Sequence, residues 1–162
     1  MPTHKQARPV RAVPDIYENG ALAFRHELAA DILARTIWGE ARGEGVKGME
    51  AVAAVVMNRV AHARAQGGNY WWGNSIIQVC QMPYQFSCWN RRDPNQRKLL
   101  EIDDRDPEFA TAKRIARRAM AKTMPDPTGG ATHYHAAAIK PNWARGRDPD
   151  RRIGHHHFYK LV

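Results

Sequence analysis

The chain has 162 residues, 43% of them hydrophobic, which fits one domain with a single sizeable core. Its formal net charge of +9 and pI near 10.0 suit an anionic partner such as nucleic acid, a membrane surface or an acidic wall polymer. No stretch approaches the roughly 18 consecutive apolar residues of a transmembrane helix, so no membrane-spanning segment is expected.

Residues 1–24 are expected to form a flexible leader, and residues 25–162 a single folded domain. The leader contains several prolines and scattered basic groups, and it shows little periodicity. It also has no apolar segment of the kind found in secretion signals. The sequence therefore predicts synthesis in the cytoplasm without a signal peptide.

Two helices are predicted in the first half of the chain. Apolar residues recur at helical spacing over 26–39. After the glycines within 43–45, a second helix is expected over 48–65. This second segment is apolar on most sides, which is typical of a buried helix.

The rest of the chain alternates between irregular and regular segments. The short apolar segment 75–80 leads into 81–90, which is too rich in Pro, Gln and aromatic residues for regular structure and is interpreted as a surface loop for recognition. Residues 106–124 form a clear amphipathic pattern, whose basic face is interpreted as solvated surface. Two short strands are predicted within 132–137 and 154–162.

The two cysteines leave the redox environment open. Cys80 and Cys88 are close in sequence. This spacing fits a local disulfide in an oxidising compartment and equally fits two reduced thiols inside a cell.

Glu40 is the main candidate for chemistry. It follows Thr36 by four residues and Ile37 by three, on the apolar stripe of the first predicted helix. Partial desolvation there would disfavour the charged form, and a neutral carboxyl group can act as a proton donor. The nearby glycines would let a bulky ligand approach it closely. The structural alternative is a glutamate that caps the helix end or pairs with Arg42.

Glu44 is a second carboxylate on the same segment. The pair Glu40 and Glu44 is spaced to imitate the two carboxylates of a glycosidase. However, Gly43 and Gly45 argue against a helix that continues through Glu44. We interpret Glu44 as a support or a substrate contact rather than a second catalytic carboxylate.

Four blocks, taken in order, resemble the SleB/CwlJ-type cell wall hydrolases, the spore-cortex-lytic enzyme family. They read IWGEARGEGVKGMEAVAAVVMNRV, QMPYQFSCWN, GGATHYHAAAIKPNWA and IGHHHFY. The resemblance covers about 32–159. It implies an α+β, mainly helical, lysozyme-like (lytic transglycosylase-like) single domain with a small β element near the C-terminus. Residues 25–162 would then be a cell wall hydrolase catalytic domain.

The resemblance also implies roles for individual residues. It makes Glu40 the catalytic acid, with no cofactor and no metal. Beside Glu44, it places these residues near a substrate groove: Gln85, Phe86, Ser87, Tyr134, Trp143 and His156. Sugar-stacking platforms are expected among Trp71, Trp72, Trp89 and Trp143. The structural alternative is that the polar side chains fix a loop and the aromatic ones fill the core.

The implied reaction cleaves peptidoglycan glycan strands between N-acetylmuramic acid and N-acetylglucosamine. Glu40 would protonate the linking oxygen. No second carboxylate is evident at a defined distance, which favours a lytic transglycosylase, forming a 1,6-anhydro sugar, over a muramidase. A basic single domain without a secretion signal is expected to be a monomer with an endolysin-like role, acting at the cell wall or periplasm after release.

Two alternatives remain from the residues themselves. The four imidazoles of His133, His135, His155 and His157 could hold zinc in a peptidoglycan amidase or peptidase. A non-catalytic binding protein could instead use the basic face of 113–122. No nucleic-acid-binding signature is present, so no nucleic-acid partner is expected.

Overall fold

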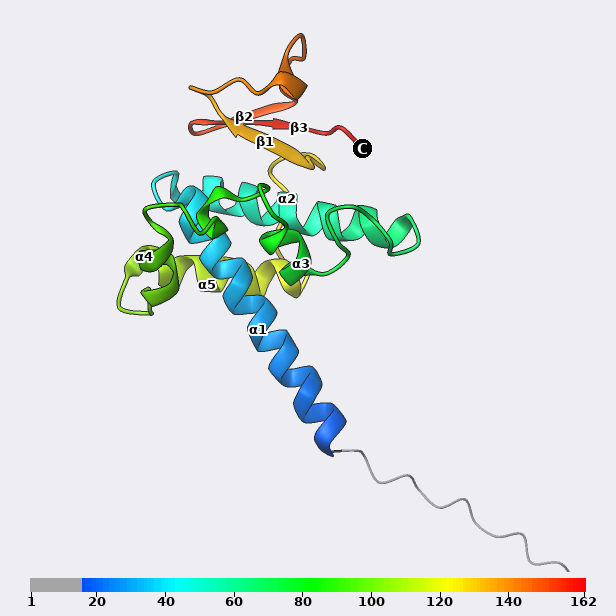
Figure 1. Ribbon diagram of the computed structural model, residues 1–162, viewed down its shortest axis with the longest axis vertical. Coiled ribbons are helices and arrows are strands. Elements are labelled where there is room, and N and C mark those ends of the chain that lie inside the picture. The colour runs from blue at the N-terminus through cyan, green and yellow to red at the C-terminus, as the bar shows by residue number, and fades with distance from the viewer. Residues whose placement is uncertain (1–15) are drawn as a thin grey trace, which may run out of the picture.

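The computed structural model describes residues 16–162. Within them the elements follow in this order: α1 (Ile16–Ala41), α2 (Gly45–Ala65), α3 (Ile76–Gln81), η1 (Ser87–Trp89), α4 (Gln96–Glu101), α5 (Pro107–Met120), β1 (His133–Ala136), η2 (Asn142–Ala144), β2 (Arg151–Ile153) and β3 (His156–Tyr159). The helices form the body, and the sheet lies above α2, away from the start of α1 (Figure 1). The structure confirms the predicted mainly helical fold with a small β element near the C-terminus.

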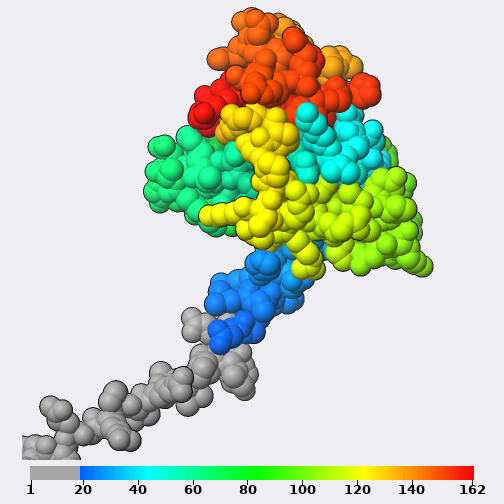
Figure 2. All heavy atoms as spheres, turned by 180° about the vertical axis from the view of Figure 1, so that it is seen from behind, coloured from blue at the N-terminus to red at the C-terminus, as the bar shows by residue number. Residues whose placement is uncertain are grey.

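Helix α1 begins at Ile16, whereas the sequence predicted a start at residue 26. Residues 16–24, which the sequence assigned to the leader, are therefore helical, and residues 1–15 lie outside the described residues. The start of α1 projects from the body (Figures 1 and 2). Leu22 and Phe24 are exposed there, so no buried stripe marks this part of the helix in the sequence.

Helix α2 is buried on two sides, as its sequence predicted. One side, with Val52 and Val56, contributes to the main core shared with α1 and α5. The other side, with Ala51 and Val55, packs in a smaller cluster with Phe158 beneath the sheet. Among the described helices, α2 included, none is long and apolar enough to cross a bilayer.

The start of α5 is tied to the last turns of α1. The Asp106 carboxylate accepts a 2.9 Å hydrogen bond from the Phe109 backbone nitrogen and so caps the helix, with Pro107 at its first position. The same oxygen accepts a 3.1 Å hydrogen bond from Trp38 Nε1. This contact fixes the part of α1 that carries Glu40.

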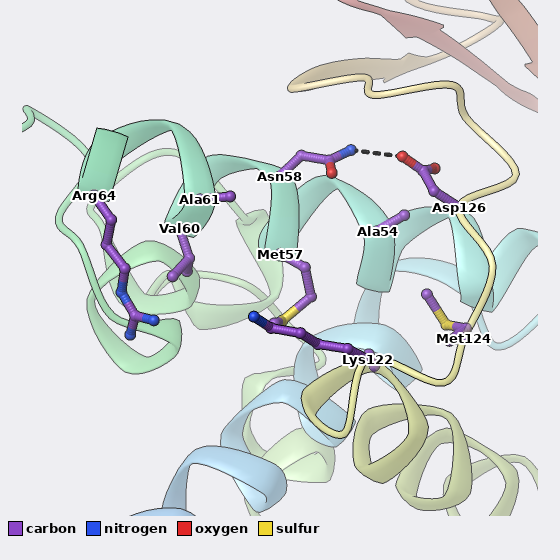
Figure 3. A pocket seen from close by; sticks show the side chains of 10 residues that line it. Ala54, Met57, Asn58, Val60, Ala61, Arg64, Lys122, Met124 and Asp126 are labelled. Carbon is purple, nitrogen blue, oxygen red and sulfur yellow. Dashed lines mark hydrogen bonds between the residues drawn. The ribbon is translucent and has the colours of Figure 1, made fainter. Parts of the chain in front are cut away.

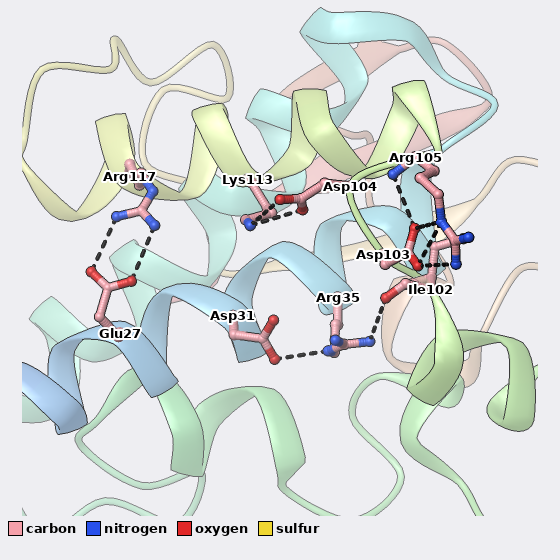
Figure 4. A network of polar contacts seen from close by, with 9 residues as sticks. All are labelled: Glu27, Asp31, Arg35, Ile102, Asp103, Asp104, Arg105, Lys113 and Arg117. Carbon is pink, nitrogen blue, oxygen red and sulfur yellow. Dashed lines mark hydrogen bonds and ion pairs between the residues drawn. The ribbon is translucent and has the colours of Figure 1, made fainter.

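The basic face of α5 is largely neutralised. Ion pairs join it to α1, to α2 and to the segment before α5: Arg117–Glu27 at 3.1 Å, Arg118–Glu50 at 2.9 Å and Lys113–Asp104 at 2.8 Å. Figure 4 shows the first and the last of these. The face is therefore a surface that helps to hold the helices together, and it does not support the alternative of a dedicated basic binding site.

The sheet is antiparallel, with strand order β1-β3-β2. Its register places Tyr134 opposite Phe158 and His135 opposite His157. The sequence predicted β1 and β3 but missed β2. That strand begins with two exposed arginines, so it shows no apolar alternation.

Candidate active site

Glu40 lies in the last turn of α1, where the helical body meets the sheet. Its side chain is half-buried. Oε1 accepts a 3.2 Å hydrogen bond from the backbone nitrogen of Cys88 in η1, and Oε2 accepts a 2.7 Å hydrogen bond from the Tyr134 hydroxyl in β1. One carboxyl group thus joins α1, the 81–90 loop and the sheet.

Gly39 allows η1 to pack against the end of α1. A Cβ at this position would lie 2.6 Å from the Cβ of Cys88, closer than two carbon atoms can approach. A loop of the protein therefore fills the space beside Gly39. The glycines that interrupt the helical pattern, and that the sequence predicted to leave room for a ligand, are Gly43 and Gly45. By contrast, no atom lies within 4 Å of a Cβ placed at Gly43 or Gly45.

Tyr134 is held by aromatic contacts on several sides. Its ring stacks on Phe158 with centroids 5.5 Å apart and meets His156 edge-on at 5.1 Å. Phe86 lies 6.3 Å away by the same measure. Burial, and then the charge and hydrogen bond of Glu40, raise the pKa of Tyr134 well above its ordinary value. Its hydroxyl therefore keeps its proton and remains a donor to Glu40.

His156 is buried beside Tyr134, with 8% of its surface exposed. Its Nδ1 has no hydrogen-bond partner within residues 16–162. Burial lowers the pKa of His156, although the charges of Glu44 and Glu40 act in the opposite direction. The imidazole is therefore neutral near pH 7.

Arg59 is a buried residue that the sequence analysis did not single out. Its Nε donates a 2.7 Å hydrogen bond to the Thr132 carbonyl, and Nη1 donates one of 3.2 Å to Gln85 Oε1. The guanidinium also lies 5.1 Å from the Trp72 ring centroid and 5.5 Å from that of Phe86. Burial lowers its pKa to about 10. The available signal was a basic residue that closely follows the apolar run 51–57 of α2.

Gln85 therefore fixes the 81–90 loop to α2 through Arg59. The sequence left open the alternative that polar side chains fix this loop, and Gln85 makes such a contact. Phe86 is buried next to Tyr134, whereas Ser87 is exposed at the start of η1. The three consecutive residues thus lie in three different environments, just before the Cys88 nitrogen that donates to Glu40.

Glu44 is bound to the turn between β2 and β3. It accepts a 2.8 Å hydrogen bond from the His155 backbone nitrogen, and His155 Nδ1 lies 3.2 Å from its other oxygen. Desolvation acts to raise the pKa of Glu44, but the hydrogen bonds from His155 outweigh it and the pKa is lowered. The geometry agrees with a supporting role for Glu44, since the carboxylate holds the sheet against the start of α2.

Trp143 lies on the face of the sheet opposite to Tyr134. Its ring packs against His133, His135 and Tyr159, with centroids 5.4, 5.7 and 5.2 Å apart. Successive residues of a strand point to opposite faces, so these partners face away from the side where Tyr134 meets Glu40. The structure therefore does not bring Trp143 together with Glu40.

The four imidazoles of the zinc alternative do not converge. His135 has both ring nitrogens engaged, at 2.8 Å from the Ala136 carbonyl and 2.9 Å from the Tyr159 hydroxyl. His155 faces Glu44 instead. No group of three or more His, Cys, Asp or Glu side chains within 16–162 is arranged to hold a metal ion. The geometry does not support a zinc amidase or peptidase.

Cys80 and Cys88 are free thiols, and both are buried. Burial raises the pKa of Cys80 to about 12 and raises that of Cys88 as well. Such thiols are poor nucleophiles. The structure thus contains the two cysteines as thiols, which is one of the two states that the sequence allowed.

A cavity of about 350 Å³ lies elsewhere, between α2 and the segment after α5 (Figure 3). Met57, Lys122 and Met124 line it. Asn58 closes one side, because its Nδ2 donates a 3.0 Å hydrogen bond to Asp126. None of the predicted site residues lines this cavity, so it is not part of the site around Glu40.

Residues 43–159 match the protein family described as Cell Wall Hydrolase. The chain belongs to this family. The match includes Glu44, the 81–90 loop and the whole sheet, and Glu40 lies just before its start. The resemblance inferred from the four sequence blocks is therefore confirmed.

Relatives and solved structures agree with this assignment. The chain is 29% identical over 130 residues to a spore cortex-lytic enzyme from Halalkalibacterium halodurans, covering 78% of this chain and 33% of that protein. The chain thus spans about a third of that relative's length.

Two solved structures are similar to the fold. The catalytic domain of the Bacillus cereus SleB protein matches with a TM-score of 0.62 and 26% identity, over 83% of this chain and 91% of that one. The catalytic domain of the germination-specific lytic transglycosylase SleB from Bacillus anthracis gives 0.61 and 26%, over 91% and 100%. These matches confirm the predicted lysozyme-like fold class.

Proposed function

We infer that the protein cleaves peptidoglycan glycan strands between N-acetylmuramic acid and N-acetylglucosamine, and that it does so at the cell wall as a lytic transglycosylase. The observation that carries this proposal is the half-buried Glu40 carboxyl group, held by Tyr134 and Cys88 where the body meets the sheet. Family membership supports it, and so does the similarity to a structure described as a lytic transglycosylase.

In the first step, Glu40 acts as the general acid. Its proton moves to the oxygen that links the two sugars while the bond from that oxygen to C1 of muramic acid breaks. Positive charge then develops on the muramic sugar, as in other glycosidase transition states. The hydrogen bond from Tyr134 fixes one carboxyl oxygen, and this restricts the direction in which the proton is delivered.

In the second step, the Glu40 carboxylate takes the proton of the 6-hydroxyl group of the same sugar. The hydroxyl oxygen bonds to C1, which closes a 1,6-anhydro ring and consumes no water. Glu44 is the nearest carboxylate along the chain, and it is committed to the His155 backbone. Its engagement favours a route that uses one carboxyl group over a mechanism with two.

Mass spectrometry of digested sacculi tests the proposal. The protein is expected to release anhydromuropeptides, and Glu40→Gln is expected to reduce the rate at least about 100-fold with an unchanged melting temperature. Glu101→Gln, which changes an exposed glutamate on α4, is the matched control and should keep full activity.

Three outcomes would contradict parts of the proposal. Reducing-end muramic acid would indicate hydrolysis instead of ring closure. Free stem peptides would place the cleavage outside the glycan strand. Full activity of Glu40→Gln would remove this glutamate from the mechanism.

A further inference from the structure

A hollow of about 600 Å³ lies beside the loop that binds Glu40. It runs from the end of α3 past the 82–85 turn to η1 and the residues after it, and Tyr84, Trp89, Arg91 and Arg92 are among its lining residues. Small-molecule sites typically measure roughly 300 to 1,000 Å³. The hollow is therefore large enough for a saccharide unit with a substituent.

Tyr84 occupies a turn that does not favour a tyrosine. The Gln85 nitrogen donates a 3.1 Å hydrogen bond to the Met82 carbonyl and closes the turn, with Pro83 second and Tyr84 third. Tyr84 has φ +65°, a conformation for which glycine or asparagine is preferred at this position. Its side chain is also 88% exposed, so packing does not explain it either. The turn thus presents an aromatic ring to solvent.

Trp89 connects the hollow to the helix that carries Glu40. Its Nε1 donates a 2.9 Å hydrogen bond to the Thr36 hydroxyl, and its carbonyl accepts a 3.1 Å hydrogen bond from Gln96. Thr36 precedes Glu40 by one helical turn, which is about 6 Å along the axis. The half-buried Trp89 is therefore fixed to the helix that carries Glu40, one turn before it.

Two arginines border the same hollow. Arg91 and Arg92 are exposed, and neither takes part in the ion pairs found within residues 16–162. Arg97 and Arg105, which follow in sequence, are each paired with a carboxylate. A guanidinium group binds carboxylates through parallel hydrogen bonds. The hollow thus combines aromatic surface with free positive charge.

We propose that this hollow is a substrate subsite for muramic acid units that carry stem peptides. The Tyr84 and Trp89 rings contact the apolar face of the sugar, and Arg91 and Arg92 bind the carboxylates of the attached peptide. The inference rests on the proposed function, because it takes the polymer bound near Glu40 to be peptidoglycan. It adds that strands bearing peptides bind more tightly than strands stripped of them.

Binding to two polymers tests the subsite. Intact sacculi and glycan strands freed of peptides by an amidase are titrated with Glu40→Gln protein, so that the polymer stays whole. Tyr84→Asn is added to this background because asparagine tolerates the left-handed turn. It is expected to weaken binding to both polymers about tenfold, with an equal or higher melting temperature.

The arginines are tested in the same background as the pair Arg91→Gln and Arg92→Gln. This variant is expected to bind intact sacculi about tenfold more weakly, with a smaller dependence on salt. It should lose less affinity for stripped strands, on which the amidase leaves one lactyl carboxylate per muramic acid in place of the peptide carboxylates. The matched control removes two exposed arginines from α1 and α5, Arg25→Gln and Arg114→Gln. The control should stay within about twofold on both polymers.

Several outcomes would overturn the subsite. The first is an affinity of Tyr84→Asn within twofold of its parent protein. The second is a loss of affinity by the arginine pair that is as large on stripped strands as on intact sacculi. The third is a loss of affinity by the control pair that is as large as that of the arginine pair. Polymer integrity is checked in the same samples. Cleavage by Glu40→Gln would contradict the proposed function. The affinities of the variants for the two polymers would still decide whether the subsite exists.

Discussion

The Tyr134 hydroxyl donates a 2.7 Å hydrogen bond to Oε2 of Glu40, and this contact joins the sheet to the end of α1. Tyr134→Phe keeps the ring contacts with Phe158 and removes the donor. We expect kcat on sacculi to fall at least about tenfold, because the carboxyl group loses one of its two positioning contacts. KM should change less than about twofold, and the free energy of unfolding should fall by about 1 kcal/mol.

Tyr159→Phe is the matched control for this substitution. The Tyr159 hydroxyl is hydrogen-bonded to His135 Nε2 at 2.9 Å, on the face of the sheet opposite to Tyr134. The control should lose similar stability and keep its kcat. If both variants lost kcat equally, the loss would come from a less stable sheet and not from the missing contact between Tyr134 and Glu40.

Gly39→Ala is expected to damage both stability and activity. The new methyl group would lie 2.6 Å from the Cys88 Cβ, so η1 must move away and the hydrogen bond from Cys88 to Glu40 must lengthen. We expect a loss of about 1 to 3 kcal/mol in the free energy of unfolding, measured in urea. Gly43→Ala has open space around it and should be neutral or slightly stabilising. Equal effects of the two substitutions would contradict this account.

Arg59→Lys tests the buried guanidinium that joins α2 to the 81–90 loop and to Thr132. Lysine cannot reproduce the two directed hydrogen bonds to Gln85 and the Thr132 carbonyl. We expect a loss of about 2 kcal/mol or more. Arg97→Lys, in an exposed pair with Glu101, should cost less than about 0.5 kcal/mol. A stable Arg59→Lys variant would show that only the positive charge is needed.

Stability is expected to fall when the pH is lowered from about 6.5 to about 4. Burial, and then the charge of Arg59, lower the pKa of His133 from 6.5 to about 4. Between these values the unfolded chain binds a proton that the native protein does not, so the free energy of unfolding decreases with decreasing pH. The contribution of His133 to stability is fully present above pH 6.5.

His133→Phe removes this titration and keeps a ring between Trp72 and Trp143. Melting temperatures measured from pH 7.5 to 4.5 should therefore depend less on pH in this variant. The dependence should not vanish, because burial also lowers the pKa values of His156 and His157. An unchanged slope would show that His133 does not contribute to it.

The sequence predicted those parts of the fold in which buried apolar residues recur at regular spacing. Helix α2 is apolar on most sides and is buried on two, and Glu40 follows the apolar stripe of α1 to the junction with the sheet. The projecting start of α1 could not be predicted in this way, because exposed residues leave no stripe. The arginines of β2 concealed a strand for the same reason.

The contacts of the site depend on segments far apart in sequence, and single-residue patterns do not reveal them. The donor at Cys88 is a backbone nitrogen, which is independent of the side chain. Trp143 fits the sequence blocks, but the turn through η2 places it on the other face of the sheet. Arg59 is one of several charged residues of α2, and the sequence does not show that it alone is buried.

The projecting start of α1 also makes selective chemical labelling feasible. Ala21 is exposed on this helix and lies about 28 Å along its axis from Glu40. Both native thiols are buried and stay protonated, so a maleimide dye would react preferentially with a cysteine introduced at Ala21. The protein could then be tethered to a bead or followed on single sacculi by fluorescence while its reactive carboxyl group remains unobstructed.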